Sequence, residues 1–305
     1  MLQSRTTMPA LQVISSRPLA GKSAIAAGLA RAFANDTVSV RLLRAGNDEA
    51  ASQDAIVFAD LLFASSPARP LAATDPFDQP NVTSVVEAPA AQTLARLPGV
   101  LVVRGAPEAS DVDLARALGD RLLGTIATRV PLGEVGAVAR ELTDSGLRPL
   151  AVLPEDRVLA APSVDEIRSA LDAGLVYDGE NATEIVEEIV IGPVYADPAR
   201  PHFQRYASKA ILAPFNKTDL LLAAIETQAA CLVITGGHDP SPYVADRAQG
   251  EETTVLLAPK ETPETVASLA YVWLTSRFRG QRKADAIYAL MEPRLDFAAL
   301  RRKLP

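Results

Sequence analysis

The residues best suited to chemistry lie near the start of the chain, where Gly21-Lys22-Ser23 stands between an apolar run and an alanine-rich stretch. A glycine, a lysine and a hydroxyl residue in this order are typical of a phosphate-binding loop between a strand and a helix. In such a loop backbone N–H groups face an anion, the lysine contacts the terminal phosphates and the hydroxyl binds Mg²⁺. The sequence therefore predicts a nucleotide site at Gly21, Lys22 and Ser23, with Ser23 also a metal ligand.

The first half of this motif departs from the pattern G-x-x-x-x-G-K-[ST], which requires glycine where this chain has Ser16. Serine fits a tight loop less well than glycine, and Pro18 removes a backbone N–H that could face a phosphate. Arg17 adds a cation between them. We expect Ser16 and Arg17 to border the ligand, but the sequence leaves open whether the loop binds one.

Length and composition set the outer limits of the interpretation. A chain of 305 residues can form two domains of ordinary size, and 48% apolar with 22% charged residues is a globular composition. The net charge of −7 argues against general nucleic-acid binding. A single cysteine, Cys231, favours a reducing compartment. We found no signal-peptide pattern and no apolar run near ~18 residues, so we expect a cytoplasmic protein that is not bound to a membrane.

Apolar runs and helical spacing alternate along the first half of the chain. The expected strands are 11–14, 38–43, 100–103, 122–128 and 147–153, and the expected helices are 23–34, 48–64, 87–97, 111–120 and 130–145. Residues 65–80 are rich in proline, alanine and aspartate and are expected to form a surface loop or lid. This alternation predicts an α/β fold with a doubly wound, mostly parallel sheet.

The alternation is interrupted near 176–182 and then resumes, which divides the chain into domains 1–178 and 179–276. The second is expected to be a smaller α/β domain with strands 187–194, 209–213, 231–235 and 253–257 and helices 219–227, 241–249 and 262–276. Residues 277–305 form a basic tail with a helix at 284–291 and another after Pro293. For this tail we favour a solvated helix face or packing on a partner subunit over nucleic-acid contact.

Several short strings follow one another in an order that resembles a known family. In the first domain they are Gly21-Lys22-Ser23, Leu42-Leu43-Arg44, Gln53-Asp54-Ala55, Phe58-Ala59 and Pro154-Glu155-Asp156-Arg157-Val158-Leu159; in the second they are Ile191-Gly192-Pro193, Pro214-Phe215-Asn216-Lys217-Thr218-Asp219-Leu220 and Ile234-Thr235-Gly236-Gly237 with Pro240. From about residue 12 to 269, the chain resembles the N-terminal portion of long bacterial phosphotransacetylases and its stand-alone relatives. That portion joins a dethiobiotin-synthetase-like P-loop domain to a DRTGG domain.

The resemblance implies a P-loop NTPase-like first domain and two ligand sites. Beyond the phosphate loop, it implies that the nucleotide is bordered by Arg104, Thr128, Pro154 and Asp156. In the second domain two turns follow strands and precede helices, so a pocket for an anionic ligand is expected from Asn216, Lys217, Asp219, Thr235, Gly236 and Gly237. The alternative for these residues is a pair of tight strand-to-helix turns without a ligand.

Three departures from the family weaken the case for catalysis. Val102-Val103-Arg104-Gly105 stands where relatives carry Val-Glu-Gly, whose carboxylate helps to hold Mg²⁺; Arg104 would repel the metal but could hold a phosphate or carboxylate. Thr128 replaces a base-reading asparagine, and Asn216-Lys217 replaces Asp-Arg. Asp48 and Asp54 remain as candidates for Mg²⁺, unless both lie on the exposed side of a helix.

Three hypotheses follow. The first is a regulatory protein without catalytic residues that senses ATP, another nucleotide or a phosphorylated metabolite. It would act on a separate acyltransferase or as a homo-oligomer, for which a dimer is expected because DRTGG-like domains associate in pairs. The second is an ATP-dependent ligase of the dethiobiotin synthetase type, and the third is a ligand-free scaffold.

The chain has no Ser-His-Asp, zinc-spacing or G-x-G-x-x-G pattern, which excludes the hydrolase, zinc and dehydrogenase classes.

Overall fold

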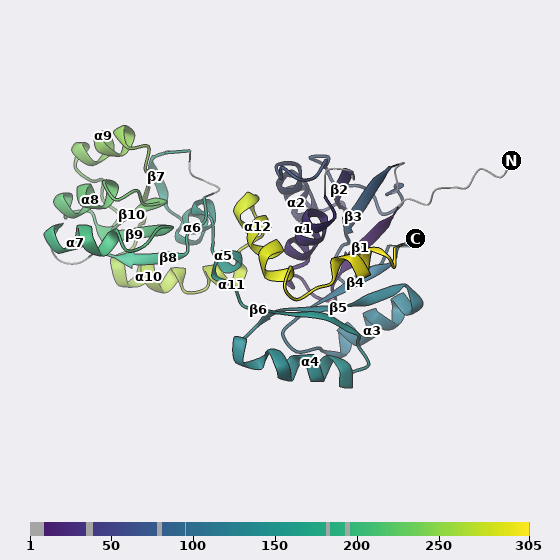
Figure 1. The fold of residues 1–305 in the computed structure, drawn as a ribbon. Helices are drawn as coiled ribbons and strands as arrows, with labels where there is room; N and C mark the ends of the chain where they lie inside the picture. The colour runs from purple at the N-terminus through teal and green to yellow at the C-terminus, as the bar shows by residue number, and fades with distance from the viewer. Residues whose placement is uncertain are drawn as a thin grey trace. The chain divides into compact units, whose positions relative to one another are not determined.

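The computed structural model describes residues 9–34, 39–77, 81–94, 96–180, 184–192 and 196–304. The chain divides into unit 1, Met1–Leu159 with Phe278–Pro305, and unit 2, Ala160–Arg277 (Figure 1). The boundary therefore precedes the expected one at 178. The reason is that the helix Val164–Leu171 buries Val164, Ile167 and Leu171 in the core of unit 2.

Unit 1 is built on a parallel sheet with helices on both faces. Its strands are β1 (Ala10–Ile14), β2 (Ser39–Arg44), β3 (Val82–Glu87), β4 (Gly99–Arg104), β5 (Leu122–Val130) and β6 (Pro149–Pro154), and their order is β2-β3-β1-β4-β5-β6. Its α-helices are α1 (Lys22–Phe33), α2 (Glu49–Ala59), α3 (Ala109–Leu118), α4 (Val135–Asp144), α5 (Arg157–Ala160), α12 (Gly280–Met291) and α13 (Phe297–Arg301). Two apolar clusters, one under α1 and α12 and one under α3 and α4, cover the two faces. This is the predicted doubly wound sheet.

The expected helix 87–97 is wrong. Val82–Glu87 is instead the strand β3, which pairs in parallel with β1 on one side and β2 on the other. The segment that follows contains Pro89 and is held by the side chain of Gln12 on β1. That amide donates to the carbonyl oxygens of Leu94 and Leu97 at 3.0 and 2.7 Å, and its oxygen accepts from the N–H of Leu94 at 2.6 Å. A strand and a tethered loop thus replace the helix.

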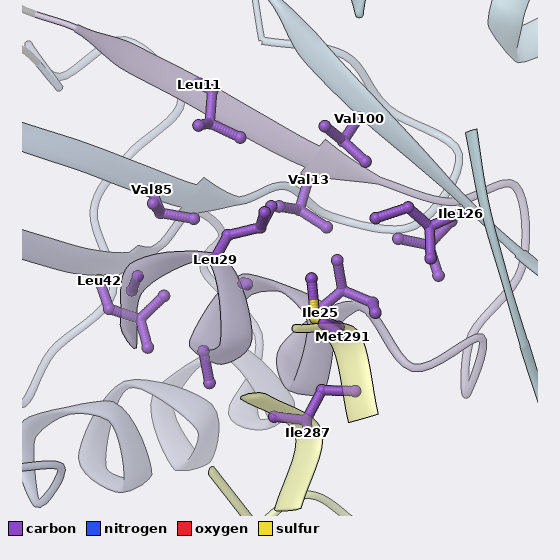
Figure 2. Close-up of a cluster of buried hydrophobic side chains, with 14 of the residues drawn as sticks. Leu11, Val13, Ile25, Leu29, Leu42, Val85, Val100, Ile126, Ile287 and Met291 are labelled. Carbon is purple, nitrogen blue, oxygen red and sulfur yellow. The ribbon is translucent and has the colours of Figure 1, made fainter. Parts of the chain in front are cut away.

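The basic tail is part of the core of unit 1. Ile287 and Met291 of α12 pack on α1, and a Cβ added at Gly28 would lie 2.6 Å from Met291 Sδ (Figure 2). Leu295 and Leu300 join the same cluster. The apolar residues of α12 recur every three to four positions, as expected of a helix with one buried face. Packing within this chain therefore replaces the expected solvated or partner-bound helix.

Unit 2 is a smaller α/β domain, as predicted. Its sheet has the order β7-β11-β10-β9-β8. The strands are β7 (Gly174–Tyr177), β8 (Glu188–Ile191), β9 (Lys209–Pro214), β10 (Cys231–Thr235) and β11 (Thr254–Leu257), and the helices are α6 (Val164–Leu171), α7 (Ala196–Phe203), α8 (Thr218–Ile225), α9 (Pro242–Gly250), α10 (Thr262–Leu269) and α11 (Val272–Thr275). Strands β8 to β11 are parallel to one another, and β7 is antiparallel to β11.

Some sequence predictions fall on residues outside the described ranges. These residues are Val38, 78–80, Ala95 of the expected helix 87–97, 181–182, Pro193, Val194 of the expected strand 187–194, and Pro305 of the tail. Cys231 is fully buried and free, and burial raises the pKa of its thiol to about 12.

Among the described residues, no helix has the length and apolar character that crossing a membrane requires.

Glu166 holds the two ends of unit 2 together. Its Oε2 accepts hydrogen bonds from the Ser163 N–H at 2.9 Å and from Ser276 Oγ at 3.3 Å, and its Oε1 accepts from the Arg277 N–H at 2.8 Å. It is also the acidic residue of the capping box that starts α6.

We expect Glu166→Ala to lower the unfolding free energy of unit 2 by about 1–3 kcal/mol, because several hydrogen bonds to one carboxylate are lost. Asp165→Ala removes the same charge from the same helical turn and is expected to cost less than about 1 kcal/mol. Urea unfolding followed by the fluorescence of Trp273, the chain's single tryptophan, reports on unit 2 alone. Equal losses of unfolding free energy in the two variants would contradict the role given to the hydrogen bonds of Glu166.

Candidate functional site

The residues expected to bind phosphate lie at the carboxyl end of β1. Here the strand order of the sheet reverses, because β2 and β3 lie on one side of β1 and β4 to β6 on the other. Such a switch point is where open α/β sheets bind ligands. The loop of residues 15–21, here called the β1–α1 loop, ends at Gly21 with a φ of 90°, and Lys22 begins α1.

The end of the β1–α1 loop is fixed by Thr128 at the end of β5. Thr128 Oγ1 donates to the Ala20 carbonyl oxygen at 2.7 Å, and a Cβ added at Gly21 would lie 3.4 Å from Thr128 Oγ1. The positive φ favours glycine at position 21, whereas the 3.4 Å approach is an ordinary van der Waals contact. Thr128, expected beside a nucleotide base, thus supports the loop that precedes Lys22.

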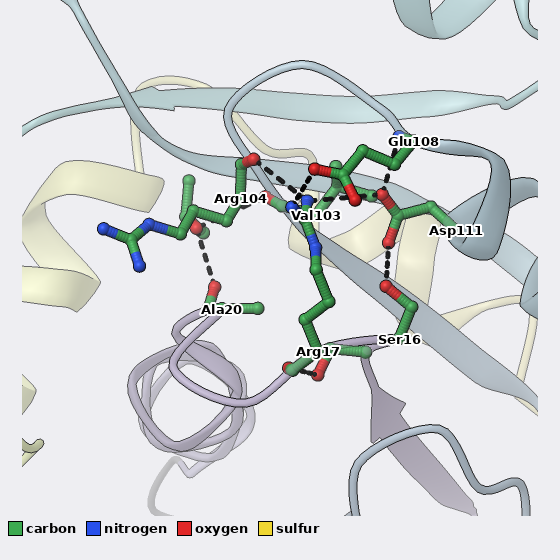
Figure 3. Close-up of polar contacts among 9 residues, drawn as sticks. Ser16, Arg17, Ala20, Val103, Arg104, Glu108 and Asp111 are labelled. Atoms are coloured by element: carbon green, nitrogen blue, oxygen red, sulfur yellow. Dashed lines mark hydrogen bonds and ion pairs between the residues drawn. The ribbon is translucent and has the colours of Figure 1, made fainter.

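The start of the loop is held by the N-terminus of α3 (Figure 3). Ser16 Oγ donates to Asp111 Oδ1 at 2.5 Å, and Asp111, only 1% exposed, also accepts from the Glu108 N–H at 2.9 Å. Arg17 pairs with the Glu108 carboxylate and donates to the Arg104 carbonyl oxygen at 3.4 Å. The serine that replaces the motif's glycine therefore has a specific partner in Asp111.

Lys22 and Glu87 form the buried centre of this edge. Lys22 is 7% exposed, and its Nζ lies 4.0 Å from Oε1 of Glu87, which ends β3. Arg44 Nε lies 3.8 Å from the same oxygen and 3.1 Å from Asp54 Oδ2. The second carboxylate oxygen of Glu87, Oε2, is buried and has no hydrogen-bond partner among the described residues.

Burial shifts the pKa values of both groups toward their neutral forms. It raises the pKa of Glu87 to about 7, and Asp54 raises it further, whereas Arg44, Lys22 and a hydrogen bond from the Ser23 side chain oppose the rise. Burial also lowers the pKa of Lys22, against the attraction of Glu87. A ligand charge placed beside this pair would therefore shift the protonation of Glu87 and Lys22.

We expect Glu87→Gln to remove a pH dependence of stability. Between the ordinary carboxyl pKa of 4.5 and about 7, the folded protein holds a proton that the unfolded chain releases, so the wild type loses stability as pH rises through this window. The glutamine variant lacks this slope and is expected to gain about 3 kcal/mol on the wild type between pH 4.5 and pH 8. Urea unfolding followed by circular dichroism, with the exposed Asp113→Asn as control, measures it. A slope that persists in Glu87→Gln would contradict the assignment.

Glu87 is the functional candidate that the sequence prediction missed. The string Val86-Glu87-Ala88 places an acid beside Lys22 at the end of β3, and the expected helix at 87–97 concealed it. The predicted metal ligands Asp48 and Asp54 have other partners: Asp48 Oδ1 accepts from the Ala51 N–H at 2.6 Å as the N-cap of α2, and Asp54 pairs with Arg44. In the described ranges, no group of three or more His, Cys, Asp or Glu side chains could hold a metal ion.

The other predicted nucleotide contacts lie along the same edge of the sheet. Arg104 ends β4, and Pro154 ends β6 opposite Val130. Asp156 Oδ1 accepts from the Leu159 N–H at 2.9 Å, so this carboxylate caps α5. Asp156 thus stabilises the start of α5, next to the expected nucleotide site.

In unit 2 the two predicted turns are neighbours, but their glycine N–H groups are occupied. The Gly236 N–H donates to the Lys260 carbonyl oxygen at 2.8 Å and the Gly237 N–H to that of Ala258 at 3.1 Å. Gly236 and Gly237 have φ values of 100° and 69°, and added Cβ atoms would meet Phe215 and Pro259 within 3.0 Å. These contacts describe a tight strand-to-helix turn in which both glycine N–H groups bond to the segment after β11.

Polar side chains surround this turn. Thr235 Oγ1 lies 2.7 Å from Thr262 Oγ1, and the rings of Phe215 and His238 lie 4.7 Å apart. Asn216, Lys217 and Asp219 are exposed. The predicted residues are therefore brought together at one edge of the sheet, where Asn216, Lys217 and Asp219 are exposed while Thr235 and the glycine N–H groups are engaged.

The fold and these sites define a two-unit α/β protein with a candidate anion site in unit 1. In the comparison with protein families, residues 166–272 of unit 2 match the DRTGG domain, as the resemblance implied.

Two known proteins are similar to parts of the chain. The phosphate acetyltransferase of Nitratidesulfovibrio vulgaris (strain Hildenborough) is 23% identical over 170 residues, which are 51% of this chain and 24% of that protein. The chain thus spans about a quarter of the length of this relative. A crystal structure of the CBS and DRTGG domains of the regulatory region of Clostridium perfringens pyrophosphatase, complexed with the activator diadenosine tetraphosphate, matches with 18% identity and a TM-score of 0.33, covering 48% of this chain and 72% of that one.

Proposed function

We propose that the chain is a regulatory protein that binds a nucleotide or another phosphorylated small molecule at the β1–α1 loop of unit 1. The observation that carries the proposal is the position of Lys22. Its ammonium group is buried at the N-terminus of α1, beside the loop and at the switch point of the sheet. Among the described residues its one carboxylate contact is Glu87, at 4.0 Å. A phosphate placed there would meet a cation and a helix N-terminus together.

The regulatory part of the proposal rests on unit 2 and on the relatives. The DRTGG match, together with the partial similarity to a phosphate acetyltransferase, supports a regulatory, ligand-sensing role. We infer that the signal is received by a separate acyltransferase or by a second copy of this chain. Dimer formation measured by sedimentation with and without nucleotide tests the second route.

One observation favours an ATP-dependent ligase of the dethiobiotin synthetase type as the second candidate. Glu87 supplies the carboxylate whose apparent absence argued against catalysis, and its Oε2 has no partner within the described chain. Together with the Ser23 hydroxyl, it provides oxygen donors of the kind Mg²⁺ uses alongside nucleotide phosphates. The bound ion would neutralise phosphate charge, while Lys22 and the loop orient the phosphates.

Calorimetric titration of ATP, ADP and AMP into the full chain, with and without Mg²⁺, tests the proposal. The expected result is saturable binding that strengthens with the number of phosphates. A regulator leaves ATP intact in the presence of Mg²⁺, whereas release of ADP or AMP would favour the ligase. Failure of all three nucleotides to bind would overturn nucleotide sensing.

A further inference from the structure

We propose that Arg104 and Arg129 of unit 1 form a second subsite, which binds a carboxylate or phosphate group of a small molecule. This subsite is distinct from the β1–α1 loop, and it does not require that the loop bind a nucleotide. Four features of the structure support it: position, backbone conformation, charge and residue type.

The two arginines come from neighbouring strands at the ligand-binding edge of the sheet. Strands β4 and β5 are parallel and paired so that Arg104 lies opposite Thr128, which places Arg129 one residue further along β5. Arg104 ends β4, the strand next to β1 at the switch point. Both side chains therefore start at the edge where open α/β sheets bind ligands.

The backbone at Arg129 is strained. Its φ is 53°, in the left-handed region that a long side chain seldom adopts, and the pairing of β5 with β6 shifts register between Ala127 and Val130. Such irregularities redirect a side chain and cluster at functional sites. The fold thus maintains a costly conformation at one of the two arginines.

The charges along this edge are balanced except at Arg104. Arg17, Lys22 and Arg44 each have a carboxylate within 4.0 Å. The guanidinium of Arg104 makes no hydrogen bond or ion pair with any described residue, and Figure 3 shows it directed away from Arg17 and Glu108. Burial lowers the pKa of Arg129, the charge of Arg104 lowers it further, and Glu155 opposes both.

The two guanidinium groups are partly buried, and the charge of Arg104 acts on Arg129, so an anion bound between the two would relieve their repulsion. Guanidinium is the side-chain group best matched to carboxylate and phosphate, because its planar N–H fork binds two oxygens at once. The subsite therefore favours a ligand with a terminal oxyanion over a neutral one.

Succinate and inorganic phosphate are suitable probes, each titrated into the full chain carrying Lys22→Ala so that the β1–α1 loop does not contribute. Anion binding raises the midpoint of thermal unfolding, and at a fixed anion concentration tighter binding gives a larger rise. We expect Arg104→Gln and Arg129→Gln to weaken binding at least tenfold, and Arg104→Lys to retain part of it. The exposed Arg116→Gln on α3 is the matched control and is expected to bind as its parent does. The preferred probe shows whether the natural group is a carboxylate or a phosphate.

A second readout separates a binding role from a structural one. Without added anion, Arg104→Gln is expected to unfold at the same temperature as its parent or a higher one, because it removes like-charge repulsion. A lower unfolding temperature would make Arg104 a structural residue and overturn the proposal. So would undiminished binding in Arg104→Gln, or no response of the parent to either probe. Nucleotide binding by the wild type is measured in a separate titration. The nucleotide site at the β1–α1 loop and the anion subsite at Arg104 and Arg129 can therefore each be disproved without the other.

Discussion

Replacing Lys22 by alanine is expected to weaken the binding of ATP about 100-fold. The ammonium group is buried beside the β1–α1 loop, so its hydrogen bonds to phosphate oxygens would form in a poorly solvated place where charge-assisted bonds are strong. The loss of one such contact costs about 1.5–3 kcal/mol, and the lost positive charge adds to it. Calorimetric titration of the wild type and the variant measures the ratio.

Lys22→Ala also leaves Glu87 buried without its nearest lysine, so a loss of binding could reflect a loss of folding. The double variant Lys22→Ala/Glu87→Gln removes the buried carboxylate that has lost one of its two cations, and it is expected to regain stability without regaining affinity. Lys217→Ala, an exposed lysine of the predicted site in unit 2, is the matched control. Full affinity in Lys22→Ala with a loss in Lys217→Ala would move the nucleotide to unit 2.

Met291→Ala is expected to destabilise unit 1 by about 2–5 kcal/mol, the usual cost of emptying a fully buried position. Met291 is 0% exposed and packs on α1, the helix that begins at Lys22. Urea unfolding followed by circular dichroism is expected to show the loss in unit 1, while Trp273 fluorescence shows unit 2 unchanged. Glu292→Ala, the next residue and exposed, is expected to stay within about 0.5 kcal/mol of the wild type.

Gly28 provides a second step for the same test. Alone, Gly28→Ala brings a methyl group against Met291 Sδ, which offsets the gain of about 1 kcal/mol in helix propensity. In the Met291→Ala background the added methyl enters the emptied space, so the same substitution is expected to stabilise. Additive effects of the two substitutions would show that α12 does not pack on α1 as described.

The sequence predicted the fold best where strands are continuous apolar runs. Gly99–Arg104 and Cys231–Thr235 are buried along nearly their whole length, so polar boundaries mark their ends. Val82–Glu87 was missed because Thr83 and Ser84 interrupt its apolar character although both are buried, and an alanine-rich segment that imitates a helix follows. The signal that could have found it is the β-branched pair Val85-Val86, ended by an acid.

The candidate site was predictable only in part, for a related reason. Gly21, Lys22 and Ser23 are adjacent in sequence, so the motif brings them together. Glu87 reaches Lys22 through the order of the strands, which no local pattern encodes. The partnership of Ser16 with Asp111 depends likewise on where α3 begins. The sequence indicated a helix at 284–291, but not that α1 covers its apolar face.

Hydrogen exchange of the full chain with and without ATP and Mg²⁺ tests the central claim most directly, because it locates the ligand without a substitution. Bound phosphates would accept hydrogen bonds from N–H groups of the β1–α1 loop and the first turn of α1. Slower exchange in residues 15–25 is the predicted result. Protection confined to unit 2 around residues 214–242, or no protection anywhere, would contradict the account.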